Sequence, residues 1–411
     1  MIRPVAELAL PQLAIQDAAF AVDPMRYIDA ARQEHPWLAR TDTGYFLVHE
    51  YQAIRDLAYM DDKFRPAMDG ITEFMGGKGG PWAEFFDNTM LAKNPPEHTR
   101  IRNSVAASFT PRNVNRHRGL MRKVISELLD TWAPKGAFDF AEFASNFPVT
   151  VMFGLIGASP EALPRIRKWL ETQGMSANLV RAMLPDLNEA IENLWLFVHA
   201  LVVERRKSGG GNEDDVLNAL IAATDSGQIS DAELHNLLIF LFGAGYDTSK
   251  NMLTLIMHAM LQNPQTWARC ADDRPFCDKV VEEAFRHTSV SSLYRIATGD
   301  VVYRDVLFPK DTILFMTLQV SGQDPNAFPD AGKFDPERAD AGRHVAFGRG
   351  MHMCLGQHLA RAQLQEGVHL IAQRLKNPRL VGEITWRPFP GVWGIASLPI
   401  AFEPGTRRVG A

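Results

Sequence analysis

The segment from Phe347 to Gly356, FGRGMHMCLG, constrains the fold of this chain more than any other stretch. It places Cys354 two positions after His352 and among three glycines, in a chain of 411 residues with only three cysteines. Glycines allow a backbone to pass close to a bound group. The apolar spacing after Leu355 predicts a helix, and the first turn of a helix stabilises a thiolate. The segment therefore predicts either a ligand site or an unusually placed core cysteine.

The chemistry of a single thiolate narrows the ligand. Tetrahedral zinc needs a cluster of several ligands, and the one cysteine of this segment is not part of such a cluster. Haem iron takes four ligands from its macrocycle and accepts one cysteine thiolate as an axial ligand. Taken alone, a lone cysteine in such a segment is also typical of a small buried hydrophobe. Both interpretations stay open from these residues.

Composition excludes several classes of protein. The net charge is -5, from 43 basic and 48 acidic residues, so no nucleic-acid or membrane partner is indicated. The densest apolar stretches, 195–203 and 237–245, are far shorter than the roughly 20 residues of a membrane span. An odd number of cysteines without a CxxC spacing fits a reducing compartment. The start has no apolar run typical of a signal peptide, so we expect a cytoplasmic protein.

Hydrophobic periodicity predicts a mainly α protein with small accessory β-sheets. Apolar residues recur every three or four positions in the segments 114–132, 186–207, 231–262, 278–287 and 357–375. Short strand-like segments are 44–49, 301–303, 312–316 and 393–399. The glycine-rich stretch 207–215 is a candidate flexible connector.

The predicted helix 231–262 has an unusual interior. A capping box formed by Ser230 and Glu233 marks its start. Further along the helix, GAGYDT brings two glycines, an acid and an alcohol into an apolar run. Each glycine costs about 1 kcal/mol relative to alanine. This cost indicates either a close helix crossing with a solvated Asp247 or a functional site.

FGRGMHMCLG resembles the haem-ligand segment of the cytochrome P-450 family at every fixed position. Glu283 and Arg286 match the family's Glu-x-x-Arg pair, with FDPER at 334–338 completing it. The segment Gly243–Thr248 is similar to the oxygen-binding kink of the family's central helix. The resemblance covers most of the chain in the family's order.

The resemblance implies the fold and the cofactor. We expect one domain over 1–411, a triangular helix-rich prism that encloses haem b (iron protoporphyrin IX), with Cys354 as the metal ligand. Phe347, Gly348 and Gly356 would lie against the macrocycle. The residues expected to bind the haem propionates are His98, Arg102, Arg295 and His352.

The resemblance also implies an activity, which is a monooxygenase reaction. Asp247 and Thr248 would deliver protons during oxygen reduction, with room made by the kink at Ala244 and Gly245. Glu283 and Arg286 would be a buried structural pair. The substrate would be an apolar small or medium organic molecule, terpenoid-like or aromatic, undergoing hydroxylation or O-dealkylation. The expected pocket residues are Phe74, Met75, Trp82, Phe85, Phe86, Met90, Leu179, Phe240, Val290, Leu293 and Ile395.

Electrons must come from another protein, because the sequence contains no flavin or iron–sulfur motif. We expect NAD(P)H to supply them through a reductase and an acidic 2Fe–2S ferredoxin, and we expect a monomer. The ferredoxin would dock on clustered cations. These are Arg102, Arg112, Arg116, Arg118, Arg122, Lys123, Arg349 and Arg361. The alternative interpretation of 112–123 is an ordinary basic helix face.

Some positions depart from the family pattern, and two further functions compete with the first. Ser321–Pro325 and Asn94 replace more frequent residues, Tyr246 stands where histidine is common, and no proline follows Arg286. These departures affect the pocket and the proximal surface. The competing functions are a peroxide-using haem-thiolate enzyme, which usually lacks the acid–alcohol pair, and a non-enzymatic haem-thiolate sensor.

Overall fold

A computed structural model describes residues 2–211 and 215–406. Its helices are α1 (Ala18–Val22), α2 (Pro24–Glu34), α3 (Tyr51–Leu57), α4 (Met68–Met75), α5 (Pro81–Asp87), α6 (Glu97–Asn103), α7 (Pro111–Arg116), α8 (Arg118–Trp132), α9 (Phe140–Ile156), α10 (Leu163–Gln173), α11 (Leu184–Ser208), α12 (Val216–Asp225), α13 (Asp231–Leu261), α14 (Pro264–Asp272), α15 (Arg274–His287) and α16 (Gln357–Arg374).

The strands form small sheets. They are β1 (Arg3–Pro4), β2 (Gln12–Leu13), β3 (Leu38–Thr41), β4 (Phe46–Val48), β5 (Phe64–Pro66), β6 (Ala137–Asp139), β7 (Leu293–Ala297), β8 (Val301–Tyr303), β9 (Val306–Phe308), β10 (Ile313–Met316), β11 (Leu375–Leu380), β12 (Thr385–Trp386), β13 (Ile395–Ser397) and β14 (Pro399–Pro404). The largest sheet has the order β2-β3-β4-β10-β7-β5, and three smaller sheets are β1-β9-β8, β11-β14-β6 and β12-β13.

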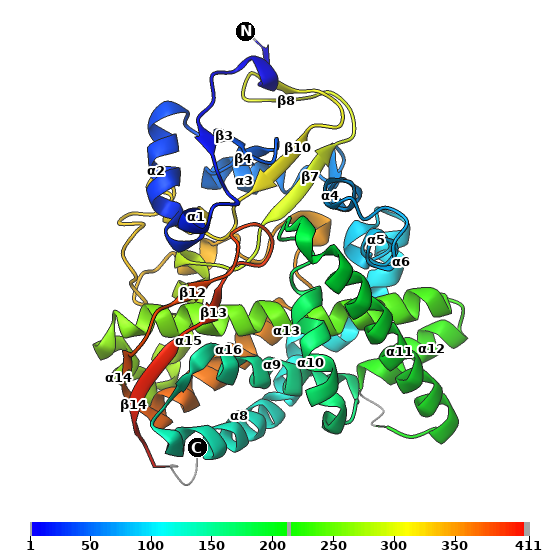
Figure 1. Ribbon diagram of the computed structural model, residues 1–411, viewed down its shortest axis with the longest axis vertical. Helices are drawn as coiled ribbons and strands as arrows, with labels where there is room; N and C mark the ends of the chain where they lie inside the picture. The colour runs from blue at the N-terminus through cyan, green and yellow to red at the C-terminus, as the bar shows by residue number, and fades with distance from the viewer. Residues whose placement is uncertain (1, 212–214, 407–411) are drawn as a thin grey trace.

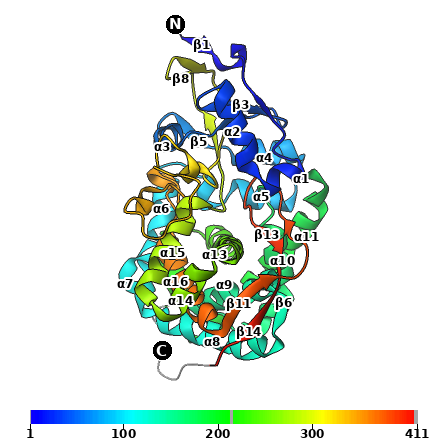
Figure 2. The same cartoon turned by 90° about the vertical axis from the view of Figure 1, so that its left-hand side faces the viewer.

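The helix-rich part and the β-rich part are arranged around one long helix. Figure 1 shows α13 crossing the centre of the molecule, with the largest sheet above it and α8, α9 and α16 below. Figure 2 looks along α13 and shows helices and the β12–β13 hairpin on all sides of it. The residues of α13 are accordingly apolar around most of its circumference, as expected for a helix enclosed by others.

The mainly α fold with small accessory sheets is confirmed, and most predicted helices have nearly the predicted bounds. The capping box at Ser230 and Glu233 begins α13, and α11 and α16 match the segments predicted for them. The prediction of one helix over 114–132 was wrong in part, because the helix is interrupted at His117, which separates α7 from α8. Helix α15 begins four residues before its predicted start, where Asp273 caps it and Pro275 occupies its first turn.

The strand predictions were correct in place and too long at their ends. Strand β8 has the predicted bounds, while β4, β10 and β13 are shorter than the predicted segments. The sequence interpretation missed β7, which pairs with β10 and β5 inside the largest sheet. Of the predicted connector 207–215, residues 212–214 lie outside the described residues; α11 continues to Ser208, and Asp215 caps α12.

None of the described helices combines the length and the apolar character that crossing a bilayer requires.

Candidate functional site

A cavity of about 330 Å³ lies between α13 and the segment that contains Cys354. The two sides of the cavity carry different chemistry: a cysteine and cationic side chains on one, small and polar helix residues on the other. All of the residues predicted to bind haem or to act in catalysis line this cavity. They are Cys354, His98, Arg102, Arg295, His352, Phe347, Gly348, Gly356, Ala244, Gly245, Asp247 and Thr248.

The loop before Cys354 is held by its own backbone and by Asp61. The amide of Cys354 donates to the carbonyl of Phe347 at 2.9 Å. Gly350 has φ +75°, and a Cβ there would lie 2.3 Å from Asp61 Oδ2, which also accepts from the amide of Met351 at 2.7 Å. Burial raises the pKa of the Cys354 thiol, while the Gly356 amide and Arg102 act in the opposite direction. Asp61 was missed by the sequence interpretation, because nothing local marks a contact across nearly 300 residues.

Four nitrogen-bearing side chains gather on one side of the cavity. The rings of His98 and His352 lie 4.3 Å apart between centroids. Burial, followed by the charges of Arg295, His98 and Arg102, lowers the pKa of His352 to about 3. Burial lowers the pKa of Arg295 to about 10. Burial likewise lowers the pKa values of His98 and Arg102. The group is therefore a cationic site whose charged forms are disfavoured in the absence of a counter-charge.

Unpaired atoms identify the kind of group that fits there. Nη2 of Arg295 and Nδ1 of His352 are buried without a hydrogen-bond partner among the described residues. Buried polar atoms are almost always paired in folded proteins, so these atoms require a partner. An anion with several oxygen acceptors would satisfy them through charge-assisted hydrogen bonds. The two propionates of haem b fit this site, with the thiolate of Cys354 available to the iron.

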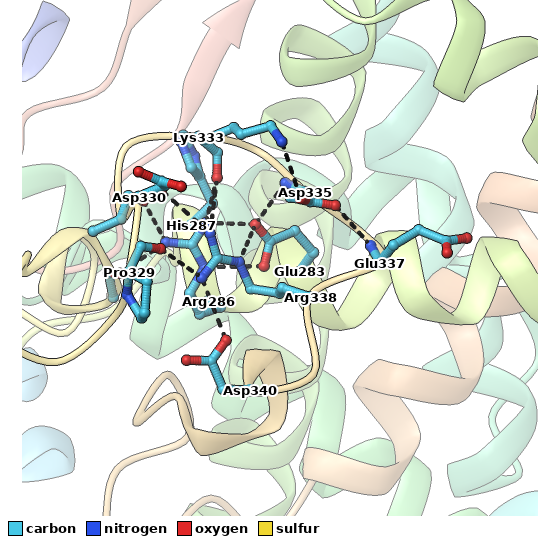
Figure 3. A network of polar contacts seen from close by, with 12 residues as sticks. Glu283, Arg286, His287, Pro329, Asp330, Lys333, Asp335, Glu337, Arg338 and Asp340 are labelled. Atoms are coloured by element: carbon cyan, nitrogen blue, oxygen red, sulfur yellow. Dashed lines mark hydrogen bonds and ion pairs between the residues drawn. The ribbon is translucent and has the colours of Figure 1, made fainter.

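The Glu283–Arg286 pair anchors the loops beside the cysteine segment. Both side chains are fully buried, and Nε of Arg286 donates to Glu283 Oε2 at 2.9 Å. Arg338, in the predicted FDPER segment, donates to Glu283 Oε1 at 3.1 Å. Figure 3 shows these side chains converging with the carbonyl groups of the surrounding loop. The amide of Asp335 also donates to Glu283, so each charge in this network has partners.

The segment Ser321–Pro325, which departs from the family pattern, contacts this network through a glycine. Nη1 of Arg286 donates to the carbonyl of Gly322 at 2.8 Å. A Cβ at Gly322 would lie 1.8 Å from the carbonyl oxygen of Arg286. The departure therefore belongs to the packing of the buried pair.

On the opposite side of the cavity, the neighbouring side chains of Asp247 and Thr248 on α13 have different partners. The hydroxyl of Thr248 donates to the carbonyl of Ala244 at 2.7 Å, and both residues line the cavity. Asp247 also lies on the cavity wall but is only 1% exposed, and its carboxylate contacts Arg387 at 2.6 Å. Arg387 was missed by the sequence interpretation.

The glycines of α13 lie at close contacts between helices, and the predicted role of Ala244 and Gly245 in making room for oxygen stays a prediction. Residues 231–261 form one continuous helix, and Ala244 and Gly245 do not interrupt it. A Cβ at Gly243 would lie 1.7 Å from Gln173 Oε1, and a Cβ at Gly245 would lie 2.5 Å from Met152 Sδ. The glycines allow α9 and α10 to pack closely, which is the helix-crossing interpretation that the sequence left open.

Only part of the predicted substrate pocket lines the cavity. Phe86, Met90, Phe240, Val290 and Leu293 lie on its wall. Phe74, Met75, Trp82, Phe85, Leu179 and Ile395 are outside the residues that line it, and their part in substrate binding stays a prediction.

These six residues pack behind or beside the wall. Trp82 is fully buried, stacks on Phe86 at 5.3 Å and donates from Nε1 to Ser176 Oγ at 3.0 Å. The guanidinium carbon of Arg181 lies over Phe74, 4.5 Å from the centroid of the phenyl ring. The other four are core side chains. Apolar character alone does not distinguish a wall residue from the layer that supports it.

Tyr246, another departure from the family pattern, points away from the cavity. Its hydroxyl donates to Glu171 Oε1 at 2.7 Å, and Lys250 contacts the same carboxylate at 3.2 Å. Burial, the charge of Glu171 and this hydrogen bond raise the pKa of Tyr246. This departure therefore joins α13 to α10 without changing the cavity wall.

The predicted docking cations are partly neutralised. Arg118 and Arg122 both contact Glu366, at 2.7 and 3.5 Å. Arg361 pairs with Glu282 at 2.8 Å. Exposed cations of this set include Arg112, Arg116, Arg122 and Lys123, which lie on α7 and α8.

A cysteine facing a cationic pocket beneath a long polar-faced helix is the arrangement of a haem-thiolate protein. The sequence profile described as Cytochrome P-450 matches residues 81–377, and the chain belongs to the cytochrome P-450 family. It is 31% identical to the luteothin monooxygenase of Streptomyces thioluteus, with 96% of each chain covered. It is 30% identical to the monooxygenase PikC of Streptomyces venezuelae, with 79% of each covered.

Solved structures agree with this assignment. The crystal structure of CalO2 superposes with a TM-score of 0.85 at 25% identity, covering 97% of this chain and 100% of that one. The tirandamycin C-bound monooxygenase TamI gives 0.82 at 25% identity, covering 95% and 100%. The protein is a P-450 monooxygenase with haem b as its cofactor. When bound, the haem supplies the redox chemistry that activates O₂ with electrons from redox partners.

Proposed function

We propose that this monooxygenase acts on an uncharged, largely apolar organic molecule held against α13. The observation that carries the proposal is the composition of the cavity wall facing Thr248. Phe86, Met90, Phe240, Val290 and Leu293 supply the apolar surface there. Arg181, a cation in the segment between α10 and α11, lies over Phe74 and outside the cavity lining, so it does not offer a partner for a substrate carboxylate there.

The relatives indicate which compounds to test first. Two of them are named the mycinamicin IV hydroxylase/epoxidase of Micromonospora griseorubida and the polyketide biosynthesis protein PksS of Bacillus subtilis. We propose polyketide-type molecules ahead of the terpenoid-like and aromatic compounds expected from sequence. A library of all three classes should be screened for the change in the haem Soret band that follows substrate binding. Binding restricted to charged compounds would contradict the proposal.

The acid–alcohol pair is the proposed proton-delivery site. Thr248 lines the cavity, where its hydroxyl would be available to hold or pass on a proton, and Asp247 lies next to it on α13. Replacing Thr248 by alanine should raise peroxide release several-fold while electron consumption continues. Thr224→Ala is a matched control, because the Thr224 hydroxyl makes the same kind of bond to Leu220 on another helix, at 2.9 Å. Unchanged product per NADH in Thr248→Ala would contradict the role.

We propose an acidic 2Fe–2S ferredoxin as the electron donor, docking on α7 and α8. The exposed side chains of Arg112, Arg122 and Lys123 support this proposal. The ion pairs of Arg118 and Arg122 with Glu366 weaken the positive electrostatic potential of this face. Arg112→Glu should slow reduction by ferredoxin and reduce its salt dependence. Arg379→Glu, on exposed β11, is the control for a change in net charge. Equal effects of both variants would contradict docking at this face.

Two competing functions are separated by one comparison of electron sources. A peroxide-using enzyme would turn over with hydrogen peroxide alone, and a sensor would turn over with neither source. Because the Asp247–Thr248 pair lines the cavity, we favour turnover that requires NADH and ferredoxin. We further propose that the enzyme works in the cytoplasm as a monomeric single domain; the free thiols of Cys270, Cys277 and Cys354 support a reducing compartment.

A further inference from the structure

Arg387 lies buried beside α13 and binds the predicted proton-delivery residue. The side chains of Arg387 and Asp247 are 8% and 2% exposed. Nη1 of Arg387 donates to Asp247 Oδ1 at 2.6 Å, and Nη2 donates to the carbonyl of Gly174 at 3.3 Å. One guanidinium therefore joins α13 to the segment that follows α10.

The segments that meet at Arg387 also form the cavity wall. Gly174 lines the cavity, and so do Gly391 and Val392, which belong to the same β12–β13 hairpin as Arg387. The amide of Arg387 donates to the carbonyl of Gly394 at 3.0 Å, which closes this hairpin. Arg387 itself is absent from the lining residues. It lies behind the wall and touches its parts from the protein side.

The carboxylate of Asp247 fits its position closely. A Cβ at Gly174 would lie 2.4 Å from Asp247 Cγ, so the carboxylate occupies space that any other residue there would need. Nδ2 of Asn251 donates to Asp247 Oδ1 at 3.1 Å. Direction and neighbours of the carboxylate are therefore set by Gly174, Asn251 and Arg387 together.

Around this carboxylate lie several buried polar atoms that lack a hydrogen-bond partner within the described residues. They are Oδ2 of Asp247, Oδ1 of Asn251, Nε of Arg387 and, against Gly243 one helix turn before Asp247, Oε1 of Gln173. Such atoms are rare and call for a partner. A buried water molecule needs two to four polar neighbours, and a group of this composition provides them. Gln173 lines the cavity, so the group extends from Arg387 to the cavity wall.

We propose that Arg387 is a positioning residue: it holds Asp247 as a buried carboxylate, turned from bulk solvent into the polar group formed by Gln173, Asp247, Asn251 and Arg387. Protons then reach α13 through this group and not by direct exchange between Asp247 and solvent. The inference rests on the proposed role of Asp247 in proton delivery. A purely structural Arg387 would tie the hairpin to α13 without controlling the charge of Asp247.

Infrared spectroscopy of the haem-loaded enzyme separates these two roles without turnover. In Arg387→Met, a carbonyl band of a protonated carboxyl group should appear, because an unpaired buried carboxylate is disfavoured. The band should be absent from wild type, from Arg387→Lys, and from the double variant Asp247→Asn/Arg387→Met. An Asp247-dependent band in wild type, or its absence from a folded Arg387→Met, would overturn the proposal.

A second variant protects the test against misfolding of Arg387→Met. Gly174→Ala keeps both charges but displaces the carboxylate, so it should produce a weaker band of the same origin. With NADH, ferredoxin and reductase, Arg387→Met should release several-fold more of its electrons as peroxide than wild type, and Arg387→Lys should restore wild-type partition. Arg379→Met, an exposed arginine on β11, controls for loss of an arginine and should match wild type. Equal peroxide release by Arg387→Met and Arg379→Met would overturn the proposal.

Failure of the proposed proton-delivery role of Asp247 can be told apart from failure of the inference about Arg387. If Asp247→Asn leaves peroxide release unchanged, the proposed proton-delivery role of Asp247 fails. The infrared bands still decide whether Arg387 sets the charge and direction of that carboxylate.

Discussion

The two sides of the cavity use buried charge in opposite ways. The anchoring side consists of the cysteine segment 347–356 and the network around Glu283, Arg286 and Arg338. Within that network the carboxylate of Glu283 has several donors, while Nδ1 of His352 in the cysteine segment is left for a bound group. The distal side, which consists of α13, α10 and the β12–β13 hairpin, leaves one oxygen of Asp247 and the Nε of Arg387 unpaired. A fully satisfied network makes its surroundings rigid, whereas unpaired buried polar atoms call for a further partner such as water. This difference separates the ion pair that holds the scaffold from the ion pair for which we propose a role in proton delivery.

The largest expected effect comes from the cysteine itself. Cys354→His should abolish the red-shifted Soret band of the reduced carbon monoxide complex, because that band depends on a thiolate ligand. Absorbance spectra of reduced, CO-saturated protein measure it. Met353→Leu, next along the same loop, should keep the band. Retention of the band in Cys354→His would show that Cys354 is not the thiolate ligand of the iron.

The buried pair of the anchoring side gives the next largest effect. Glu283→Gln should reduce the free energy of unfolding by about 3–5 kcal/mol, since it leaves Arg286 buried without its counter-charge. Urea denaturation and haem retention measure the loss. Glu282→Gln is the matched control, because Glu282 is 26% exposed and pairs with half-buried Arg361. Equal losses in both variants would show that burial does not distinguish these neighbours.

The close packing of α13 gives a smaller effect on the distal side. Gly245→Ala should cost about 1–3 kcal/mol of unfolding free energy, because the added methyl group must displace Met152. Gly119→Ala on α8 meets no atom within 4 Å and should instead stabilise the fold by about 0.5–1 kcal/mol. Urea denaturation of both variants measures the contrast. A stabilised Gly245→Ala variant would mean that the α9–α13 contact is loose.

Close to neutral pH, the smallest effect concerns His49, a buried histidine on the β-rich part whose two ring nitrogens lack partners among the described residues. Burial, followed by the charge of Arg32, lowers the pKa of His49 from 6.5 to about 3. The unfolded chain then binds the proton more strongly. The contribution of His49 to stability is present above pH 6.5 and falls, at up to about 1.4 kcal/mol per pH unit, as pH drops toward 3.

Urea midpoints measured on both sides of pH 6.5 test this. His49→Leu should flatten the decrease in stability below that pH, since leucine binds no proton. His358→Leu, at a half-buried position on α16, is the control for losing a histidine and should leave most of the slope in place. An unchanged slope in His49→Leu would show that other groups control the acid sensitivity.

The anchoring side could largely be predicted from sequence, because its chemistry is concentrated in short motifs. The loop around Cys354 and the Glu283–Arg286 pair each depend on residues a few positions apart. Local spacing also fixes the period of a helix, so most helix bounds followed. The cationic pocket required the family resemblance, because its members come from distant segments.

The distal side could not be predicted to the same extent. Arg387 meets Asp247 across 140 positions of sequence, and no local pattern marks such a contact. Trp82 and Phe86 have similar apolar character, yet only Phe86 faces the cavity. Residues 293–297 form strand β7 because they pair with β10 and β5, and these partners cannot be read from the local sequence. The residues for which we propose roles in substrate choice and proton transfer are thus the ones that need three-dimensional information.

Gly322 has a consequence for how this enzyme tolerates change. Its Cα faces the carbonyl of Arg286 so closely that a Cβ would lie 1.8 Å from the oxygen, and backbone cannot move aside as a side chain can. Every amino acid other than glycine would force the loop from the buried pair. In a survey of all single substitutions, we expect this inconspicuous position to be as intolerant as Cys354. A residue that has no side chain to take part in chemistry is therefore expected to be among the positions of the scaffold that tolerate no substitution.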